Sequence, residues 1–164
     1  MNPILFYTFG GLAVVTALLM VTRQNPIASA LWLVVNFFAF AALFALLSAH
    51  FIAVIQILLY AGAIMVLFIF VIMLLNLREE EIKPRQLQFS GLLGGGLVIY
   101  LIVLLVLGLL KIPAAPFEAS TEGFGYVAPV GRLLFTKYLI PFELTSVLLL
   151  VAIVGSVVMG KRKL

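Results

Sequence analysis

The feature that most constrains this chain is an uninterrupted apolar run over residues 51–76 that contains no charged side chain. A helix needs about 20 residues, at about 1.5 Å of rise per residue, to cross the hydrocarbon core of a bilayer. The run is therefore long enough to span a membrane. Because lipid does not tolerate unpaired backbone polar groups, a spanning segment of this kind is expected to be helical.

Composition extends this conclusion to the whole chain. Of the 164 residues, 65% are hydrophobic and 10% are charged, whereas a soluble domain carries about 25% charged residues. The mean hydropathy is +1.32. We therefore predict an all-α integral membrane protein with one membrane domain over residues 1–164. Its five transmembrane helices are expected at about residues 4–21, 27–49, 51–76, 89–110 and 138–160, with a long extramembrane loop over residues 111–137.

Repeated prolines and glycines in that loop indicate irregular structure, and the aromatic residues between them indicate that it is not a free tail. We expect the loop to lie on the surfaces of partner subunits.

The distribution of basic residues predicts an orientation. With five spans, the two termini lie on opposite sides of the membrane. One side receives seven basic residues and the other receives three, and cytoplasmic loops carry the excess of Lys and Arg. We therefore expect the amino terminus and the long loop outside and the carboxyl terminus in the cytoplasm. The seven are Arg23, Arg78, Lys83, Arg85, Lys161, Arg162 and Lys163, and the three are Lys111, Arg132 and Lys137.

Polar and small residues interrupt the third predicted span near its centre. Gln56 and Tyr60 are four residues apart and share one face of a helix, which Ala63 continues. Gly62 weakens a helix by about 1 kcal/mol relative to alanine. A glycine there also permits close approach of a neighbouring helix, or a local departure from α-helical geometry.

Two other polar residues fall inside predicted spans. Asn36 lies in the second span, where an amide needs a hydrogen-bond partner; a structural bond to another helix is favoured over the lining of a water path. Glu143 lies near the start of the fifth span. A carboxylate at a helix amino end is stabilised by the helix dipole, and this interpretation is slightly favoured over a functional intramembrane charge.

The inventory of reactive side chains limits the chemistry of the chain. It contains no cysteine, so iron–sulfur ligation and thiolate chemistry have no residue to use. The single histidine, His50, cannot ligate haem on two sides. No redox cofactor or metal site is therefore expected in this chain.

Several stretches together resemble subunit J of bacterial respiratory complex I, the counterpart of mitochondrial NADH dehydrogenase subunit 6. Residues 56–76, and above all YAGAIMVLF over residues 60–68, resemble the third span of that family. Residues 25–31 are similar to its entry to the second span, and residues 131–143 to its approach to the fifth. The resemblance covers the whole chain.

This resemblance implies a subunit without cofactors in the membrane arm of a proton-pumping NADH–quinone oxidoreductase, near its quinone-reducing part. NADH, flavin, iron–sulfur clusters and quinone would be used by partner subunits. The partners would be other membrane-arm subunits, especially the small subunits with membrane carboxylates and the quinone-site subunit. The chain would lie, with lipid around it, in the bacterial inner (plasma) membrane, without nucleic acid and without activity alone.

The resemblance also implies a π-bulge in the third span around the Tyr-Ala-Gly segment. In the family, its rotation between bulged and regular helix is associated with making or breaking a water path across the membrane. We expect the region 60–66 to depart from a regular α-helix in at least one state of the assembled complex. The residues expected to form the helix hinge and gate the water path are Gln56, Tyr60, Ala61, Gly62, Ala63, Met65 and Val66.

Two alternatives belong to other functional classes. A small independent transporter would need a mid-membrane charge or an inverted repeat, and the five spans show neither. The related subunit of a multisubunit cation/proton antiporter is separated from the complex I subunit only by the resemblance. Copurification with quinone-reductase subunits, or with antiporter subunits alone, would distinguish these two.

Overall fold

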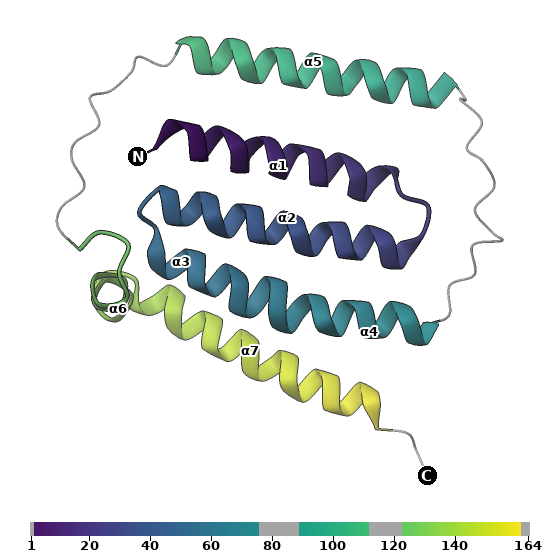
Figure 1. The fold of residues 1–164 in the computed structure, drawn as a ribbon. Helices are drawn as coiled ribbons and strands as arrows, with labels where there is room; N and C mark the ends of the chain where they lie inside the picture. The colour runs from purple at the N-terminus through teal and green to yellow at the C-terminus, as the bar shows by residue number, and fades with distance from the viewer. Residues whose placement is uncertain (1, 76–88, 112–122, 162–164) are drawn as a thin grey trace.

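A computed structural model of the chain describes residues 2–75, 89–111 and 123–161, and every regular element in these ranges is a helix (Figure 1). In chain order the helices are α1 (Pro3–Thr22), α2 (Pro26–Leu46), α3 (His50–Ile55), the π-helix η1 (Gln56–Ile64), α4 (Met65–Leu75), α5 (Phe89–Lys111), α6 (Val127–Phe135) and α7 (Leu139–Gly160).

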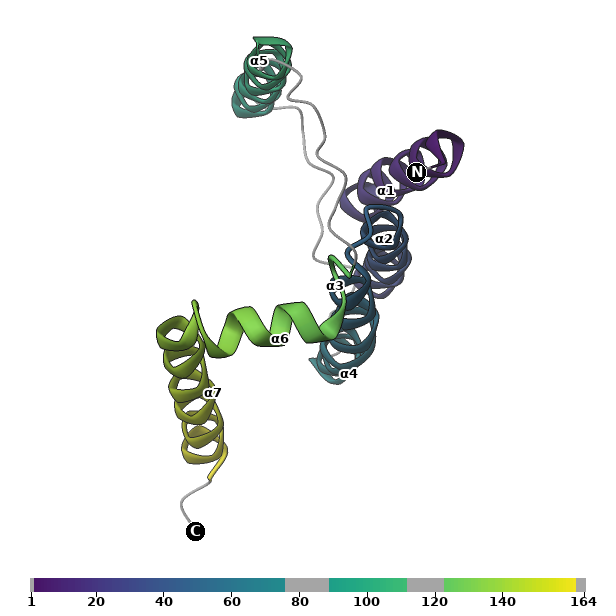
Figure 2. The same ribbon diagram turned by 90° about the vertical axis from the view of Figure 1, so that its left-hand side faces the viewer.

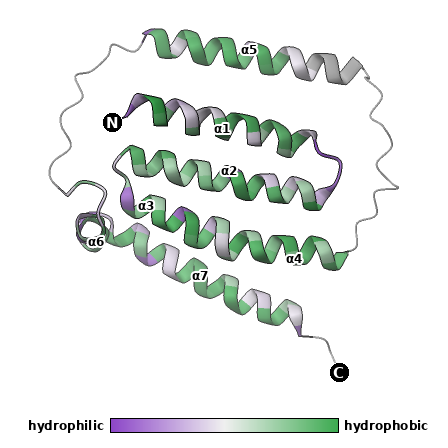
Figure 3. Ribbon diagram, viewed as in Figure 1, coloured by the Kyte–Doolittle hydropathy of each residue, from purple (hydrophilic) through white to green (hydrophobic). Residues whose placement is uncertain are grey.

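Five helical segments in the described ranges are long and apolar enough to cross a membrane. They are α1, α2, the continuous α3–η1–α4 segment of 26 residues, the part of α5 from Gly94 to Lys111, and α7. Hydrophobic residues predominate along these segments (Figure 3). The prediction of an all-α chain with five membrane-spanning helices is confirmed.

Local sequence explains where the first two helices begin. The side chain of Asn2 accepts a hydrogen bond from the amide of Ile4 at 3.2 Å, and that of Asn25 accepts from the amide of Ile27 at 2.9 Å. Each cap is followed by a proline at the first helical position, where its missing N–H costs nothing.

The second helix ends earlier than residue 49, where the sequence placed its end. α2 stops at Leu46, and Ser48 adopts a φ of 63°, in the left-handed region that terminates helices. The amide of Ala49 then donates to the carbonyl of Phe44 at 2.9 Å, which closes a tight turn into α3.

Three antiparallel rods form one layer, with α2 between α1 and the α3–η1–α4 rod (Figures 1 and 2). Small residues fill the contacts between them and allow the backbones to approach closely. The buried apolar residues are Ala13 of α1, Ala30, Ala39 and Ala41 of α2, and Ala53, Ala61 and Met65 of the third rod.

Polar side chains also join α1 to α2. The amide nitrogen of Asn36 donates to the carbonyl of Ala13 at 2.7 Å and to the hydroxyl of Thr16 at 2.9 Å. Both Asn36 and Thr16 are buried. The hydroxyl of Ser29 donates to the carbonyl of Met20 at 2.6 Å. Each bond pairs a group that would otherwise be unsatisfied in hydrocarbon.

The remaining helices stand apart from this layer. α6 runs crosswise between the layer and α7 (Figure 2). The ring centroids of Phe135 and Phe142 lie 5.1 Å apart where α6 turns into α7. The side chains of α7, and those of α5 from Gly94 onward, are exposed apart from the partly covered Gly155. These helices therefore offer their surfaces to lipid or to other subunits.

Helix α6 corrects the expectation of irregular structure throughout residues 111–137. Pro129 is its third residue, within the first turn, where proline removes no helical hydrogen bond. Part of the long loop, residues 112–122, lies outside the described residues.

Candidate functional site

The third span contains the structural feature that sets this chain apart from a simple bundle of helices. Between α3 and α4, nine residues form the π-helix η1. At its end, the amide of Met65 donates to the carbonyl of Tyr60, five residues back, and also to that of Gly62. π-Helical segments are rare and occur frequently at functional sites.

The structure brings most of the predicted hinge residues into this segment. Gln56, Tyr60, Ala61, Gly62 and Ala63 lie in η1. Met65 and Val66 were also expected to depart from α geometry, but they begin the regular helix α4. The π segment begins at Gln56, before the predicted region 60–66. Residues 60–64 of the predicted region therefore depart from α geometry in this structure, whereas Met65 and Val66 are α-helical in it.

The π geometry leaves little room for a side chain at Gly62. A methyl group added at its Cα would lie 3.3 Å from the carbonyl oxygen of Ile57, five residues earlier. That separation is tighter than an ordinary van der Waals contact, so either the carbonyl or the added carbon would have to move. Glycine therefore lets the wider turn close without strain at this position.

One side of η1 packs against α2. Ala61 is buried, and Met65 directly after η1 is 2% exposed. The ring of Tyr60 meets the ring of Phe37 on α2 edge to face, with centroids 5.6 Å apart. Such a pair contributes about 0.5–1.5 kcal/mol beyond its buried area.

The polar groups of η1 remain available to other partners. Tyr60 is 44% exposed and Gln56 is partly exposed. Within the part of the chain that the structure describes, neither side chain makes a hydrogen bond. Their amide and hydroxyl groups can therefore bind water or groups of a neighbouring subunit.

The two other predicted polar residues do not join this cluster. Asn36 points its amide toward α1, where both of its hydrogen bonds lie, and it acts as a structural bond between helices. Glu143 is the fifth residue of α7 and is exposed, and no acidic residue occupies the first turn of that helix. The structure thus places Glu143 near the start of α7, as expected, but in its second turn, beyond the first turn in which the helix dipole stabilises a carboxylate most.

Sequence reasoning did not identify two partners of the third span. One is Phe37, whose contact with Tyr60 depends on which faces of α2 and η1 pack against each other. The other is the segment of residues 123–126, which packs against the turn between α2 and α3. Its signal in the sequence is the pair Gly123 and Gly125 beside aromatic residues, and both glycines adopt positive φ.

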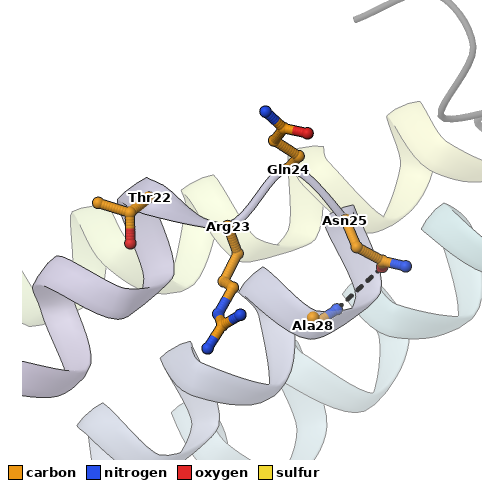
Figure 4. Close-up of a pocket in the computed structure, with 5 residues that line it drawn as sticks. All are labelled: Thr22, Arg23, Gln24, Asn25 and Ala28. Atoms are coloured by element: carbon orange, nitrogen blue, oxygen red, sulfur yellow. Dashed lines mark hydrogen bonds between the residues drawn. The ribbon is translucent and has the colours of Figure 1, made fainter.

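The turn between α1 and α2 carries a surface pocket lined by Thr22, Arg23, Gln24, Asn25 and Ala28 (Figure 4). The side chain of Asn25 accepts from the amide of Ala28 at 3.1 Å and so serves as the cap of α2. Within residues 2–75, 89–111 and 123–161, no three His, Asp or Glu side chains gather closely enough to hold a metal ion.

The chain is similar to known proteins over nearly all of its length, the third span included. Residues 16–159 match the family described as NADH-ubiquinone/plastoquinone oxidoreductase chain 6.

The relatives include bacterial and chloroplastic proteins. NADH-quinone oxidoreductase subunit J of Rhodobacter capsulatus is 32% identical, over 96% of this chain and 80% of the relative. Subunit J of Pseudomonas aeruginosa is 35% identical, over 96% and 95%. The chloroplastic NAD(P)H-quinone oxidoreductase subunit 6 of Staurastrum punctulatum is 37% identical, over 99% and 92%. This chain belongs to the family of NADH-ubiquinone/plastoquinone oxidoreductase chain 6, as a multi-pass membrane subunit of an NADH-quinone oxidoreductase complex.

Proposed function

We propose that this chain gates or shapes the water path that couples quinone reduction to proton translocation, through a change of register in η1. The observation that carries the proposal is the π-helix over Gln56–Ile64 in the middle of a membrane span. A π turn departs from regular α-helical hydrogen bonding, and in lipid no water is present to satisfy a backbone group that loses its partner. Because π-helical segments occur frequently at functional sites, its presence here indicates a functional role.

The geometry of helices says what a register change would do. An α-helix advances about 100° per residue, because it has 3.6 residues in a turn. Converting the π segment to α-helix removes its additional residue from the register. One flank of the span would then turn by about 100° relative to the other and move by about 1.5 Å along the axis. The side chains that face a neighbouring subunit would be exchanged for others.

The residues of η1 are suited to such an exchange. Gln56 and Tyr60 carry polar groups without hydrogen-bond partners in the described chain, whereas Leu58, Leu59 and Ile64 beside them are apolar and exposed. A turn of the helix would replace polar by apolar side chains on the same surface. Water would be ordered in one register and excluded in the other.

We infer further that the chain holds no redox cofactor. The sequence has no cysteine and one histidine, so electron transfer, NADH oxidation and quinone reduction would belong to partner subunits. These partners would be the quinone-site subunit and the small membrane-arm subunits that carry carboxylates. The basic residues favour an orientation with the amino terminus outside. The bacterial relatives support the bacterial inner membrane as the location.

The antiporter alternative makes a different prediction about partners. The three relatives described above carry names of NADH- or NAD(P)H-quinone oxidoreductase subunits. These names support the quinone-oxidoreductase assignment over an antiporter that performs no NADH chemistry.

Substitution of Gly62 tests the proposal in membranes that contain the assembled complex. Gly62→Val is expected to lower coupled NADH:quinone reductase activity and proton pumping several-fold, with a smaller effect on the amount of complex. The valine carbons would crowd the carbonyl of Ile57 in the π register. Gly10→Val in α1, where an added Cβ meets nothing within 4 Å, is the matched control. Normal assembly with parental pumping in Gly62→Val would show that Gly62 serves ordinary packing.

A further inference from the structure

We propose that residues 123–126 form a clamp that holds the amino end of the third span, so that a register change in η1 turns α4 and leaves α3 in place. This inference rests on the proposed function and adds the direction of the movement. It assigns Gly125 as a positioning residue, which acts on η1 only through α3.

The first contact of the clamp supplies a missing helix cap. Ala49, the residue before α3, offers no side chain that could accept a hydrogen bond from the first turn. The amide of Phe51 is one of the donors that an α-helix leaves unpaired at its amino end. It donates instead to the carbonyl of Gly125 at 2.8 Å. The clamp therefore completes α3 from a distant part of the chain.

The second contact is a close approach of two backbones. A Cβ on Gly125 would collide with the carbonyl oxygen of Ser48 and lie 3.0 Å from the Cα of Ala49. Gly125 also adopts a φ of +79°, which side chains disfavour. Both the space and the backbone conformation require glycine at this position.

The third contact joins two rings. His50, the first residue of α3, lies with its ring centroid 5.1 Å from that of Tyr126, at an interplanar angle of 38°. The turn beneath this pair is itself fixed, since the amide of Ser48 donates to the carbonyl of Ala45 at 3.1 Å. The amino end of the span is thus tied both to α2 and to the clamp.

The carboxyl side of η1 is held less firmly within the described chain. From Val66 to Leu75, only Ile69 and Ile72 are partly covered, and the other side chains are exposed. Among the described residues, no side-chain hydrogen bond fixes this part of the span. When a helix changes register, rotating its loosely packed end costs less free energy than rotating its tied end, because fewer contacts are broken. α4 is therefore the part that moves.

Spin labels on the two flanks test this direction in the assembled complex. The chain has no cysteine, so Val54→Cys in α3 and Met73→Cys in α4 each give one labelled site in it, and the labelled parental complex gives the background from other subunits. The two positions are matched in exposure, at 55% and 57%. Spectra are recorded at rest and during turnover with NADH and quinone. The clamp predicts a second spectral component at position 73 during turnover and none at position 54.

A substitution in the clamp completes the test. Gly125→Ala should release α3, so that the label at position 54 also gains a second component. Gly123→Ala is the matched control, because Gly123 has a similar φ of +90° but its added Cβ would meet only Pro129, at 4.0 Å. This variant should behave as the parental complex.

The outcomes separate the two proposals. A new component at position 54 in the parental complex, or an unchanged position 54 in Gly125→Ala, would overturn the clamp while leaving the register change standing. Parental spectra that stay the same at both positions during turnover would overturn the register change, and the clamp with it.

Discussion

The ring of Tyr60 in η1 stands at 65° to the ring of Phe37 in α2, with their centroids 5.6 Å apart. This edge-to-face pair is a direct contact between the π segment and the neighbouring helix of the layer. Because a register change would turn residues of η1 relative to α2, the contact is specific to the register that the structure shows. It therefore stabilises the π form relative to an α-helical form.

Removing this contact should shift the balance between the two forms. Phe37→Leu would lose about 0.5–1.5 kcal/mol of aromatic pairing, and about 1.4 kcal/mol corresponds to a tenfold change in an equilibrium. We expect a lower fraction of complexes with the π form, measured by classification of single-particle images, and altered turnover. Phe38→Leu is the control, since Phe38 is 50% exposed and makes no ring contact in the described chain. Equal effects of the two substitutions would contradict the role given to Phe37.

Asn36 should matter for assembly and not for coupling. Asn36→Ala removes two hydrogen bonds between α1 and α2, which in a membrane are worth about 1–2 kcal/mol together. We expect less assembled complex at raised temperature and unchanged turnover for each complex that forms. Thr8→Ala removes a hydroxyl that bonds only within α1 and serves as the control. A loss of pumping in fully assembled Asn36→Ala complex would show that the amide lines a proton path.

Glu143→Gln should have a small effect on both assembly and turnover. The residue lies in the second turn of α7, beyond the first turn where a carboxylate gains about 0.3–1 kcal/mol from the helix dipole. It makes no ion pair within the described residues. Assembly and proton pumping of the variant are measured beside those of Gly62→Val, which should be lower. An intact Glu143→Gln complex without pumping would make Glu143 an essential part of the proton path.

Much of the fold follows from hydropathy and from local start signals. Five long apolar runs predict five spans, and Asn25 followed by Pro26 marks the beginning of α2. The end of α2 could not be read in the same way, since Ser48 in a left-handed conformation has no distinctive sequence signal. Helix α6 was missed because Pro129 and Gly131 indicate irregular structure, although a proline in the first turn is compatible with a helix.

Only part of the candidate site could be predicted from the sequence. Gly62 among bulky residues indicates a weak point in the helix, but the start of the π segment at Gln56 depends on hydrogen bonds that reach five residues back. The contacts of Tyr60 with Phe37 and of Phe51 with Gly125 depend on how distant segments face one another. Tertiary packing decides which residues of distant segments meet, and no local pattern in this sequence encodes that packing.

The most direct test of the central claim compares the backbone of the third span in the assembled complex at rest and during turnover, at a resolution that shows carbonyl groups. The account predicts two populations. In one, the amide of Met65 bonds to the carbonyl of Tyr60, as here; in the other, it bonds to that of Ala61 in a regular α-helix with α4 turned. A bond from Met65 to Tyr60 in every population of an actively pumping complex would contradict it.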